Sequence, residues 1–538
     1  MVEPMNRQQR RQTAEPAKRQ GQVSQEPRIA AARQADKEGR HAEAEVIYDQ
    51  LLAENPRNAD AIHFKGLLFY QHGRNEEAVA ILRQAIKLRS DLASFHGNLA
   101  NVLFYMGETD AAESECRKAI RLDKKYVTAY SNFSALLLGK GAFAEAETTV
   151  RQAISLQPNN AEAYNNLATI LRRQSRLRDT EAAFHRALEL DPNYEELRGN
   201  LIFLRDFNTG LNFEDQQKDR REWAERFVDS LSVHWKPHEN EKSPDRRLRI
   251  GYVSGDFRNH SAAITFGAAL FERDRQEFEV FCYMTSVQRD AITEKFENNA
   301  DAWRPCWGLT DVDLDAQVRA DKIDILVDLA GHSAGNRLPV FARKPVPIQI
   351  TAWGHCTGTG MKAMDYILAD WVIMPPEDAK HCAENVVELS CGLSFVAPEG
   401  APDVLAAPSS TRDHVTFGCF NRIEKIVDET LHVWSEVLQR VPNARLVLKN
   451  AALDSPEAVS QLRQRIADQN IDLMVKKIWP KHMAAFGALD IALDPFPNNG
   501  GVTILETLWM GVPVIAARGS TAPSRVAASI LTACGHSE

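Results

Sequence analysis

Several features that would assign a protein to a class are missing from this sequence. Its eight cysteines are scattered and contain no C-x-x-C pair, which argues against a cysteine zinc site and against a disulfide framework. No stretch approaches about 18 uninterrupted apolar residues and no apolar leader is present, so neither a membrane span nor a signal peptide is predicted. The net charge of −9 gives no sign of a nucleic-acid surface. We therefore expect a cytoplasmic protein without nucleic-acid or membrane partners.

A repeat occupies the first third of the chain, after a polar stretch at 1–27 that predicts a disordered tail. A small residue recurs every 34 positions, at Gly39, Gly73, Gly107, Gly141 and Ser175. Alanine keeps the same period at Ala85, Ala119, Ala153 and Ala187. This period, with two amphipathic helices per unit, is the tetratricopeptide signature. We expect the glycine at the turn between the two helices, the alanine at a close helix contact, and an α-solenoid over 28–205.

Asparagine follows the same period and bears on function. It occurs at Asn98, Asn132, Asn166 and Asn200, one position on the first helix of each unit. That helix lines the concave face of such a superhelix, where an amide can both donate to and accept from a passing peptide backbone. We therefore predict an asparagine ladder that binds acceptor polypeptides. The alternative is that these amides cap or bridge neighbouring repeats.

From Leu248 onward, short apolar runs alternate with helical stretches, as a doubly wound parallel sheet requires. The expected strands are Leu248–Val253, Glu277–Tyr283, Ile323–Leu329, Ile348–Ala352, Tyr366–Ala369, Val415–Cys419, Arg445–Leu448, Ile491–Asp494 and Val512–Ala516. A polar segment at 406–413 separates two series of strands, so we predict two Rossmann-like lobes at 246–405 and 406–538, preceded by a helical linker at 206–245. Ligands of such sheets bind beyond the carboxyl ends of the strands, which points to the cleft between the lobes.

Three loops that follow strands of the first lobe carry candidate residues. The first contains His260, although a single histidine of this kind is more often structural. The second, GHSAGNR, contains His332. The third, GHCTGTG, contains His355, Thr357 and Gly358, and its glycines would let backbone amides approach a ligand.

The second loop also matches the G-x-S-x-G pattern of a hydrolase nucleophile elbow, with Ser333 as the nucleophile. An elbow serine must open directly into a long helix. Prolines 339, 345 and 347 leave space for only about two helical turns before the next strand. We therefore expect the loop to border a sugar or acceptor, and Ser333→Ala to leave most activity intact.

A fourth loop, DPFPNNGGVT, runs into the helical stretch ILETLWMG in the second lobe. Gly500, Gly501 and Thr503 would offer unpaired amides, the positive end of a helix dipole and a hydroxyl, which together suit a phosphate. Glu506, one turn further on, would accept a bond from a ribose hydroxyl, and Lys425 would add a cation to the same cleft. Structural or surface roles are the alternative for each of these residues.

The repeat array followed by two lobes resembles the O-linked N-acetylglucosamine transferases and their bacterial homologues. Four motifs carry the resemblance: RIGYVSGDFRNH, PVPIQITAWGHCTGTGMKAMDYILAD, FGCFNRIEKI and DPFPNNGGVTILETLWMGVPVI. The resemblance covers nearly the whole chain from about residue 28. It implies a GT-B fold and an inverting transferase that moves a sugar from UDP-N-acetylglucosamine to serine or threonine of polypeptides, without a metal or other cofactor.

The resemblance also implies roles for individual residues. His260 matches the family histidine near the sugar and acceptor, Lys425 the lysine that stabilises the departing diphosphate, and His482 the histidine beside the uridine. Glu506 stands where the family has an acidic residue on the ribose. The start of the pyrophosphate-binding helix is matched by Asn499, Gly500, Gly501 and Thr503.

The sequence departs from the family pattern at several positions. Val502 stands where the family has a first phosphate-binding threonine, and Ala485 stands where some members have an arginine near the nucleobase. Arg422 replaces a polar amide, although an arginine would serve a diphosphate equally well. The sequence ends at ACGHSE, where relatives continue, so we expect the second lobe to lack its C-terminal end. Two alternatives follow: a tetratricopeptide scaffold with an inactive transferase remnant, and a related protein glycosyltransferase that uses another UDP-sugar.

Overall fold

The computed structural model describes residues 25–536, apart from 175, 208–209, 244, 334, 396–399, 451–452, 454–455, 467–470 and 476–480. Ser175, one of the predicted repeat positions, therefore lies outside the described residues. The chain divides into two compact units, residues 1–166 and 167–538. No described helix is both long and apolar enough to cross a bilayer.

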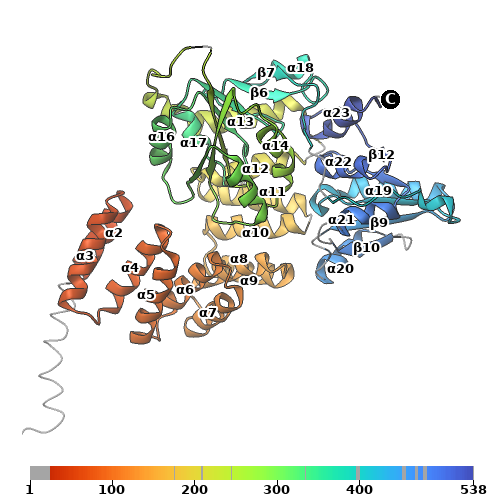
Figure 1. The fold of residues 1–538 in the computed structure, drawn as a ribbon. Coiled ribbons are helices and arrows are strands. Elements are labelled where there is room, and N and C mark those ends of the chain that lie inside the picture. The colour runs from red at the N-terminus through yellow and green to blue at the C-terminus, as the bar shows by residue number, and fades with distance from the viewer. Residues whose placement is uncertain are drawn as a thin grey trace, which may run out of the picture. The chain divides into compact units, whose positions relative to one another are not determined.

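The first unit is built from antiparallel helix pairs, drawn in red to orange in Figure 1. Its helices are α2 (Glu26–Lys37), α3 (His41–Glu54), α4 (Ala59–Gln71), α5 (Asn75–Leu88), α6 (Ala93–Tyr105), α7 (Thr109–Leu122), α8 (Val127–Gly139), α9 (Phe143–Leu156) and the start of α10 (Ala161–Arg173). The glycines Gly39, Gly73, Gly107 and Gly141 have φ between 71° and 80°, in the turn within each pair. This left-handed conformation favours glycine and ends a helix sharply. The periodic alanines Ala85, Ala119 and Ala153 are completely buried.

The second unit begins with the end of α10 and three more helices. These are α11 (Leu177–Leu190), α12 (Glu195–Arg205) and α13 (Phe213–Phe227), followed by a short 3-10 helix, η1 (Asp229–His234). They continue the helical pattern of the first unit along the chain and provide the start of the predicted linker. Trp223 and Ala224 of α13 lie in the same apolar core as Phe281 and Leu326 of the sheet that follows.

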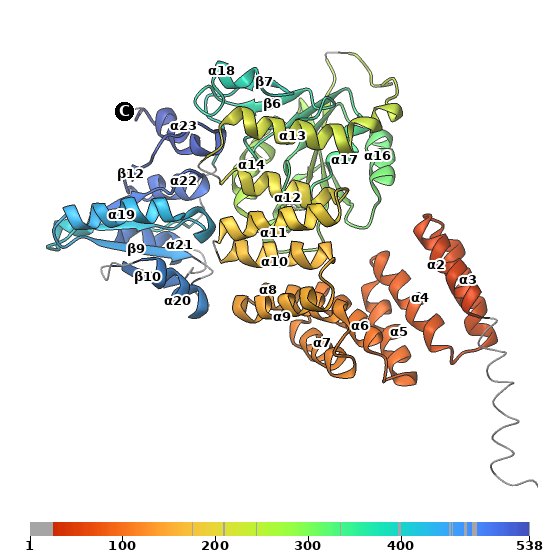
Figure 2. The same cartoon turned by 180° about the vertical axis from the view of Figure 1, so that it is seen from behind.

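The first sheet is fully parallel and has the strand order β3-β2-β1-β4-β5-β6-β7. Its strands are β1 (Leu248–Ser254), β2 (Phe278–Met284), β3 (Ala302–Pro305), β4 (Ile325–Asp328), β5 (Ile348–Thr351), β6 (Tyr366–Ala369) and β7 (Asn385–Glu388). Alternate residues face opposite sides: Tyr283 packs with α13, whereas Cys282 packs with Phe266 of α14 (Ser261–Phe271) and Phe296 of α15 (Ala291–Asn299). Figure 2 labels α13 and α14 beside this sheet. The sheet also has the short helices α16 (Asp311–Ala320), α17 (Leu338–Ala342) and α18 (Pro376–Ala379).

The second sheet is also parallel and has the order β10-β9-β8-β11-β12. Its strands are β8 (Thr416–Cys419), β9 (Arg445–Asn450), β10 (Ile471–Val475), β11 (Ile491–Leu493) and β12 (Val514–Ile515). Its helices are α19 (Asp428–Arg440), α20 (Pro456–Arg465), α21 (Lys481–Ala484), α22 (Val502–Trp509) and α23 (Val526–Ala533). Trp434 of α19 packs on one face, and Met483 and Met510 pack on the other. The predicted fold class, an α-solenoid followed by two α/β lobes, is confirmed.

Candidate functional site

Both sheets have one point at which the strand order reverses. In the first sheet it lies between β1 and β4, and in the second between β8 and β11. Ligands of parallel sheets bind beyond the carboxyl ends of the strands at such points. The loops that contain His260 and His332 follow β1 and β4, and those that contain Lys425 and the NNGG motif follow β8 and β11. The topology therefore brings the candidate loops to the places where each sheet can hold a ligand.

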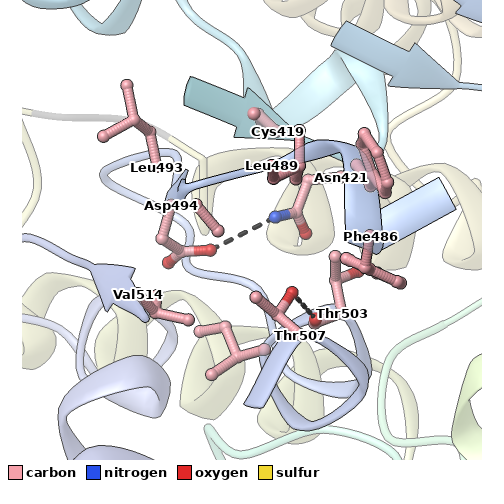
Figure 3. Close-up of a pocket in the computed structure, with 13 residues that line it drawn as sticks. Cys419, Asn421, Phe486, Leu489, Leu493, Asp494, Thr503, Thr507 and Val514 are labelled. Carbon is pink, nitrogen blue, oxygen red and sulfur yellow. Dashed lines mark hydrogen bonds between the residues drawn. The ribbon is translucent and has the colours of Figure 1, made fainter. Parts of the chain in front are cut away.

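Asp494, at the end of β11, organises the loop before α22. Its side chain is buried and accepts hydrogen bonds from the backbone amide of Gly500 at 2.9 Å and from Nδ2 of Asn421 at 3.2 Å. Figure 3 shows Asn421 and Asp494 joined across a small pocket that Phe486, Thr503 and other residues line. A Cβ atom at Gly500 would lie only 2.7 Å from an Asp494 oxygen, so the position requires glycine. Burial raises the pKa of Asp494.

Lys425 lies beside this loop, in the 3-10 helix η3 (Ile423–Lys425). Its ammonium donates a hydrogen bond to the carbonyl oxygen of Asn499. Burial, followed by the charge of the Arg422 cation, lowers the pKa of Lys425 to about 8, while Asp494 acts in the opposite direction. The electrostatic neighbours of Lys425 also include Cys356 of the first lobe.

Helix α22 begins directly after Gly501, which is its N-cap residue. The amides of Ile504 and Leu505 bond to the carbonyl of Gly501, so the amides that precede them stand at the open end of the helix. The partial positive charge of a helix amino end attracts anions. Lys425, Asn499, Gly501 and Thr503 are thus brought together, and we call them the cationic corner. The amide of Gly500, which the sequence predicts to be unpaired, instead donates to the Asp494 carboxylate. Val502 contributes no hydroxyl there.

A buried chain of hydrogen bonds links β9 to α22 through His482. The Lys449 ammonium, 2% exposed, donates to Nδ1 of His482 at 2.8 Å and to its carbonyl oxygen at 3.1 Å. Nδ1 must then be the acceptor, so the proton lies on Nε2, which donates to Oε2 of Glu506 at 3.0 Å. The Lys449 ammonium also lies 4.5 Å from the centre of the Phe420 ring. Two predicted nucleotide residues, His482 and Glu506, therefore contact each other, held by a lysine that our sequence analysis missed.

In the first lobe, His260 is the N-cap residue of α14. Its Nδ1 accepts a hydrogen bond from the amide of Ala262 at 3.3 Å and lies 3.3 Å from a carboxylate oxygen of Asp256. The side chain is 38% exposed. His260 is therefore accessible at the carboxyl end of β1, as a residue near a sugar or acceptor should be.

The GHCTGTG loop turns its side chains toward the linker helices. Thr357 is completely buried, and its Oγ accepts from the Arg220 guanidinium at 2.5 Å and lies 2.6 Å from Nδ1 of His355. The other ring nitrogen of His355 lies 3.1 Å from a carboxylate oxygen of Asp206. Arg220 and Asp206 form a buried ion pair at 2.9 Å. In this structure His355 and Thr357 therefore join the first sheet to α12 and α13.

The glycines of this loop serve the same packing. A Cβ atom at Gly360 would lie 2.5 Å from the backbone of Arg220, and one at Gly358 would lie 2.9 Å from the carboxylate of Glu384. Glu384 is buried, which raises its pKa, and it accepts a hydrogen bond from the amide of Thr359 at 2.6 Å. The close approach that we expected for a ligand is made instead by other parts of the chain.

The loop after β4 also faces inward. His332 is buried against the edge of the Trp223 ring, with centroids 4.7 Å apart, and its Nε2 donates to the carbonyl of Thr359 at 2.8 Å. Burial lowers the pKa of His332 to about 3, so the ring is neutral. The Ser333 hydroxyl donates to the carbonyl of Ala330 at 2.7 Å, and the helix that follows, α17, has five residues. This geometry is not that of a nucleophile elbow.

Two amides of the predicted ladder bridge adjacent repeats. Nδ2 of Asn98 lies 2.9 Å from Nε2 of His63, and Nδ2 of Asn132 donates to the carbonyl of Gly97 at 3.3 Å. Both asparagines are half-buried, as are Asn166 and Asn200. The alternative role, bridging between repeats, is therefore present at two positions, and it uses the NH₂ group of each amide.

Comparison with known proteins assigns both parts of the chain. The profile of glycosyl transferase family 41 matches residues 225–395 and 408–538, and tetratricopeptide profiles match 66–107, 93–126 and 161–194. A protein of Arabidopsis thaliana named probable UDP-N-acetylglucosamine–peptide N-acetylglucosaminyltransferase SPINDLY is 34% identical over 351 residues, covering 62% of this chain and 38% of the relative. Its rice counterpart, from Oryza sativa subsp. japonica, is 35% identical over 349 residues, covering 60% of this chain and 37% of the relative.

A solved structure has nearly the same fold. The Thermobaculum terrenum O-GlcNAc transferase, solved as a mutant form, superimposes with a TM-score of 0.78 at 32% identity, covering 83% of this chain and 86% of that one. The chain spans less than two fifths of the length of the plant relatives. The family profile, the repeats and the superposition agree with the geometry described above, and the chain belongs to glycosyl transferase family 41.

Proposed function

We propose that this chain is an inverting glycosyltransferase that moves N-acetylglucosamine from UDP-N-acetylglucosamine to serine or threonine of polypeptides. The observation that carries the proposal is Lys425 beside the amino end of α22, at the point where the order of the second sheet reverses. The names of the plant relatives and of the superimposed bacterial structure support the same donor and acceptor class.

The cationic corner explains how a diphosphate would leave. As the bond between the sugar and the diphosphate breaks, negative charge grows on the β-phosphate. The Lys425 ammonium and the open amides of α22 are fixed in advance where that charge develops, which is the arrangement that lowers a barrier most. Arg422, whose charge reaches Lys425, would add a second cation.

The hydrogen-bonded residues Lys449, His482 and Glu506 would bind the nucleoside. Glu506 would accept from a ribose hydroxyl with the carboxylate that now holds His482, and His482 would lie beside the uridine. His260, exposed at the end of β1, would contact the sugar or the acceptor hydroxyl. We assign His332, His355, Thr357 and Gly358 to holding the first-lobe loops in place, because their contacts are with α13, Asp206 and Glu384.

The repeat superhelix would bind the acceptor polypeptide. Because Asn98 and Asn132 use their NH₂ groups between repeats, their carbonyl oxygens would accept hydrogen bonds from peptide amides. Asn166 and Asn200 would extend the ladder. We also place the protein in the cytoplasm, since all eight cysteines are free thiols and suit a reducing compartment.

Thermal unfolding with a nucleotide panel tests the donor site. UDP and UDP-N-acetylglucosamine should raise the melting temperature, and ADP and CDP should not, because only a ligand that prefers the folded state stabilises it. No shift with any uridine nucleotide would contradict the proposal. A mass-spectrometric assay with UDP-N-acetylglucosamine, UDP-glucose and an acceptor protein then tests transfer. Binding of UDP without transfer from either sugar would favour the inactive remnant.

Lys425→Met tests the corner directly. Transfer should fall by about 10²- to 10³-fold, the usual cost of one fixed electrostatic group at a site of charge development. Lys362→Met is the matched control, because Lys362 is an exposed lysine of the first lobe paired with Asp229. Equal activity of the two variants would remove Lys425 from the mechanism.

A further inference from the structure

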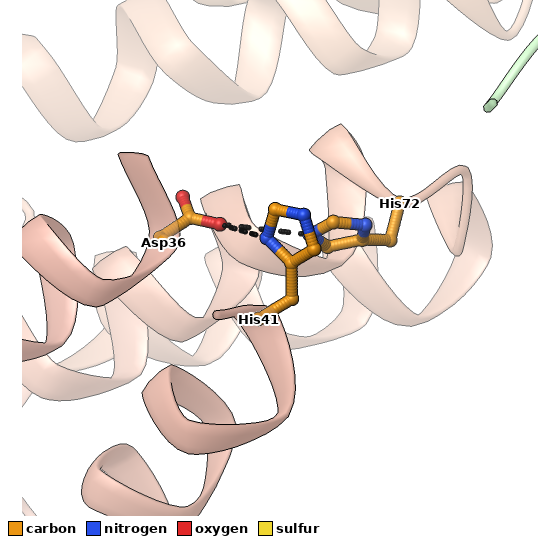
Figure 4. Close-up of side chains that lie close together, drawn as sticks. All are labelled: Asp36, His41 and His72. Carbon is orange, nitrogen blue, oxygen red and sulfur yellow. Dashed lines mark hydrogen bonds and ion pairs between the residues drawn. The ribbon is translucent and has the colours of Figure 1, made fainter. Parts of the chain in front are cut away.

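We propose that Asp36, His41 and His72 form a binding site for one divalent transition-metal ion, such as Zn²⁺, at the start of the repeat superhelix. Figure 4 shows the three side chains converging from separate elements. Asp36 lies in the last turn of α2, His41 is the first residue of α3, and His72 directly follows α4. This site is independent of the glycosyltransferase site and of the scattered cysteines.

Two of the three distances between ligand atoms lie near the value for a tetrahedral site. Oδ1 of Asp36, Nδ1 of His41 and Nε2 of His72 lie within 4.8 Å of one another. Bonds of about 2.1 Å to a tetrahedral Zn²⁺ place neighbouring ligand atoms about 3.4 Å apart. The Asp36–His72 distance is 3.5 Å, and the Asp36–His41 distance of 2.9 Å must widen by about half an ångström. Side-chain rotation alone can achieve this.

The donor set is chemically suited to the ion. Two neutral imidazoles and a carboxylate are common zinc ligands, and three protein ligands leave a fourth position for water. All three side chains are partly exposed, with His41 at 38%, His72 at 31% and Asp36 at 17%. An ion can therefore enter without unfolding, and water can complete its coordination.

The charges nearby do not oppose a cation. Arg40 precedes His41, Arg74 lies two positions after His72, and Lys37 and Arg33 lie on the same helix as Asp36. Arg40 contacts Glu38 and Glu43, and Arg74 contacts Glu45 and Glu77. With Asp36, five carboxylates stand against four cations, which leaves a small excess of negative charge.

The repeat architecture does not require these residues. One period of 34 residues further on, Asp36, His41 and His72 are replaced by Tyr70, Asn75 and Met106. Their place in the fold suggests what an ion would do. The apolar core of α2, α3 and α4 contains Ile29, Tyr48 and Leu68. An ion joining α2, α3 and α4 would add a bond among the three helices that share this core.

The experiment uses the full chain without an affinity tag, stripped with a chelator and titrated with zinc sulfate in a calorimeter. One ion per chain is expected. His41→Ala and His72→Ala should each weaken binding by at least about tenfold, as loss of a metal-supporting residue does. His185→Ala is the control, because His185 is an exposed histidine 3.8 Å from a single carboxylate, that of Glu181. Co²⁺ should give the visible absorption bands of a tetrahedral site in the wild type and not in His72→Ala.

Hydrogen exchange gives a second measurement, which reports where in the chain the ion stabilises the fold. Zinc should slow amide exchange over residues 26–54 in the wild type and in His185→Ala, but not in His72→Ala. Hydrogen exchange of the metal-free variants shows whether they remain folded. If either histidine variant is unfolded, Asp36→Asn, which keeps the size of the side chain, replaces it in the experiment. Absence of saturable binding, or binding that survives both histidine substitutions, would overturn the proposal.

Discussion

At the scale of single residues, the charges of the candidate site are positioned by the chain itself. Lys425 is held by the carbonyl of Asn499, and His482 is held between Lys449 and Glu506. Such groups lose little freedom when a ligand binds, and fixed groups are the ones that stabilise developing charge. The protonation of these residues leads to two predictions.

The first prediction concerns the pH dependence of catalysis and the charge of Lys425. Burial, followed by the charge of Arg422, lowers its pKa to about 8, while Asp494 and the thiols of Cys356 and Cys419 act in the opposite direction. The ammonium is therefore present below this pH and lost above it. The value of kcat/KM for the donor, which reports the free enzyme, should fall as pH rises through about 8. The value of kcat should fall only at higher pH, because a bound diphosphate keeps the ammonium charged.

Steady-state rates over about pH 6 to 10 separate these outcomes. Lys425→Arg, whose guanidinium stays protonated, should lose the decline in kcat/KM even if its rate is low. A wild-type kcat that declines together with kcat/KM near pH 8 would contradict the assignment of this pKa to Lys425.

The second concerns Lys449, a positioning residue. Its ammonium makes Nδ1 of His482 an acceptor and so places the ring proton on Nε2, facing Glu506. Lys449→Met keeps the stem and removes the charge. KM for the donor should rise by about tenfold, because a buried hydrogen bond to a charged group contributes about 1.5 kcal/mol, while kcat changes little. Lys362→Met is again the control.

NMR of labelled histidine gives a readout that loss of stability would not produce. Wild-type His482 should show the Nε2–H tautomer, and Lys449→Met should show a mixture of tautomers or a changed titration. An unaltered His482 signal in a variant with raised KM would assign Lys449 a purely structural role.

At the scale of elements, most of the strands found in the sequence are buried ones, and the exposed edge strand β12 was found as well. The runs that became β1, β2, β4, β8 and β9 are apolar because helices cover both sides. The three strands that were missed, β3, β7 and β10, lie at sheet edges. Most residues of β3 and β7 are partly or fully exposed, so no apolar run marks them.

The glycine loops show why sequence alone cannot separate ligand contacts from packing. GHCTGTG and DPFPNNGG both require close backbone approach, but the partner differs. Gly360 approaches Arg220, 140 positions earlier in the chain, whereas Gly500 approaches Asp494 in its own loop and leaves the start of α22 open. The local pattern indicates a glycine loop in both places, but only the tertiary fold shows which residue each glycine approaches.

Gly360 and Gly335 provide a matched pair that tests the docking of this loop on α13. Both are glycines of the first lobe with φ near 76° to 79°. A Cβ atom at Gly335 meets nothing within 4 Å, whereas one at Gly360 meets the Arg220 backbone at 2.5 Å. Gly335→Ala should therefore cost about 1 kcal/mol for its backbone conformation. Gly360→Ala should cost about 2 kcal/mol more, because a packed neighbour must move.

Denaturant unfolding of both variants measures the difference, and Gly308→Ala, with open space and no left-handed φ, should be close to neutral. Equal losses of stability at 335 and 360 would show that the loop is not packed against α13 in solution.

At the scale of the α/β unit, the last segment joins the two lobes. Ala522 lies in an apolar core with Ile367 and Ile373 of the first lobe, and Ile530 lies in one with Ile504 of the second. The Ser529 hydroxyl of α23 donates to the Asp370 carboxylate that follows β6. The proposed site takes residues from both lobes, so this brace would hold those residues at a fixed distance.

Arg525 is the residue on which this connection can be tested. It is 8% exposed, it pairs with Asp378 of the first lobe, and it donates to the Ile373 carbonyl at 3.3 Å and to the Ser520 carbonyl at 2.8 Å. Arg525→Met keeps the apolar stem but leaves the Asp378 carboxylate without its cation. Removing one member of a mostly buried ion pair costs about 3–5 kcal/mol of folding stability.

Scanning calorimetry of the full chain should show the α/β unit of Arg525→Met unfolding at a lower temperature and in two steps, because the lobes no longer support each other. Arg518→Met, at an exposed arginine of the preceding loop, should leave the curve unchanged. If the two variants give the same curve, Arg525 plays no part in joining the lobes.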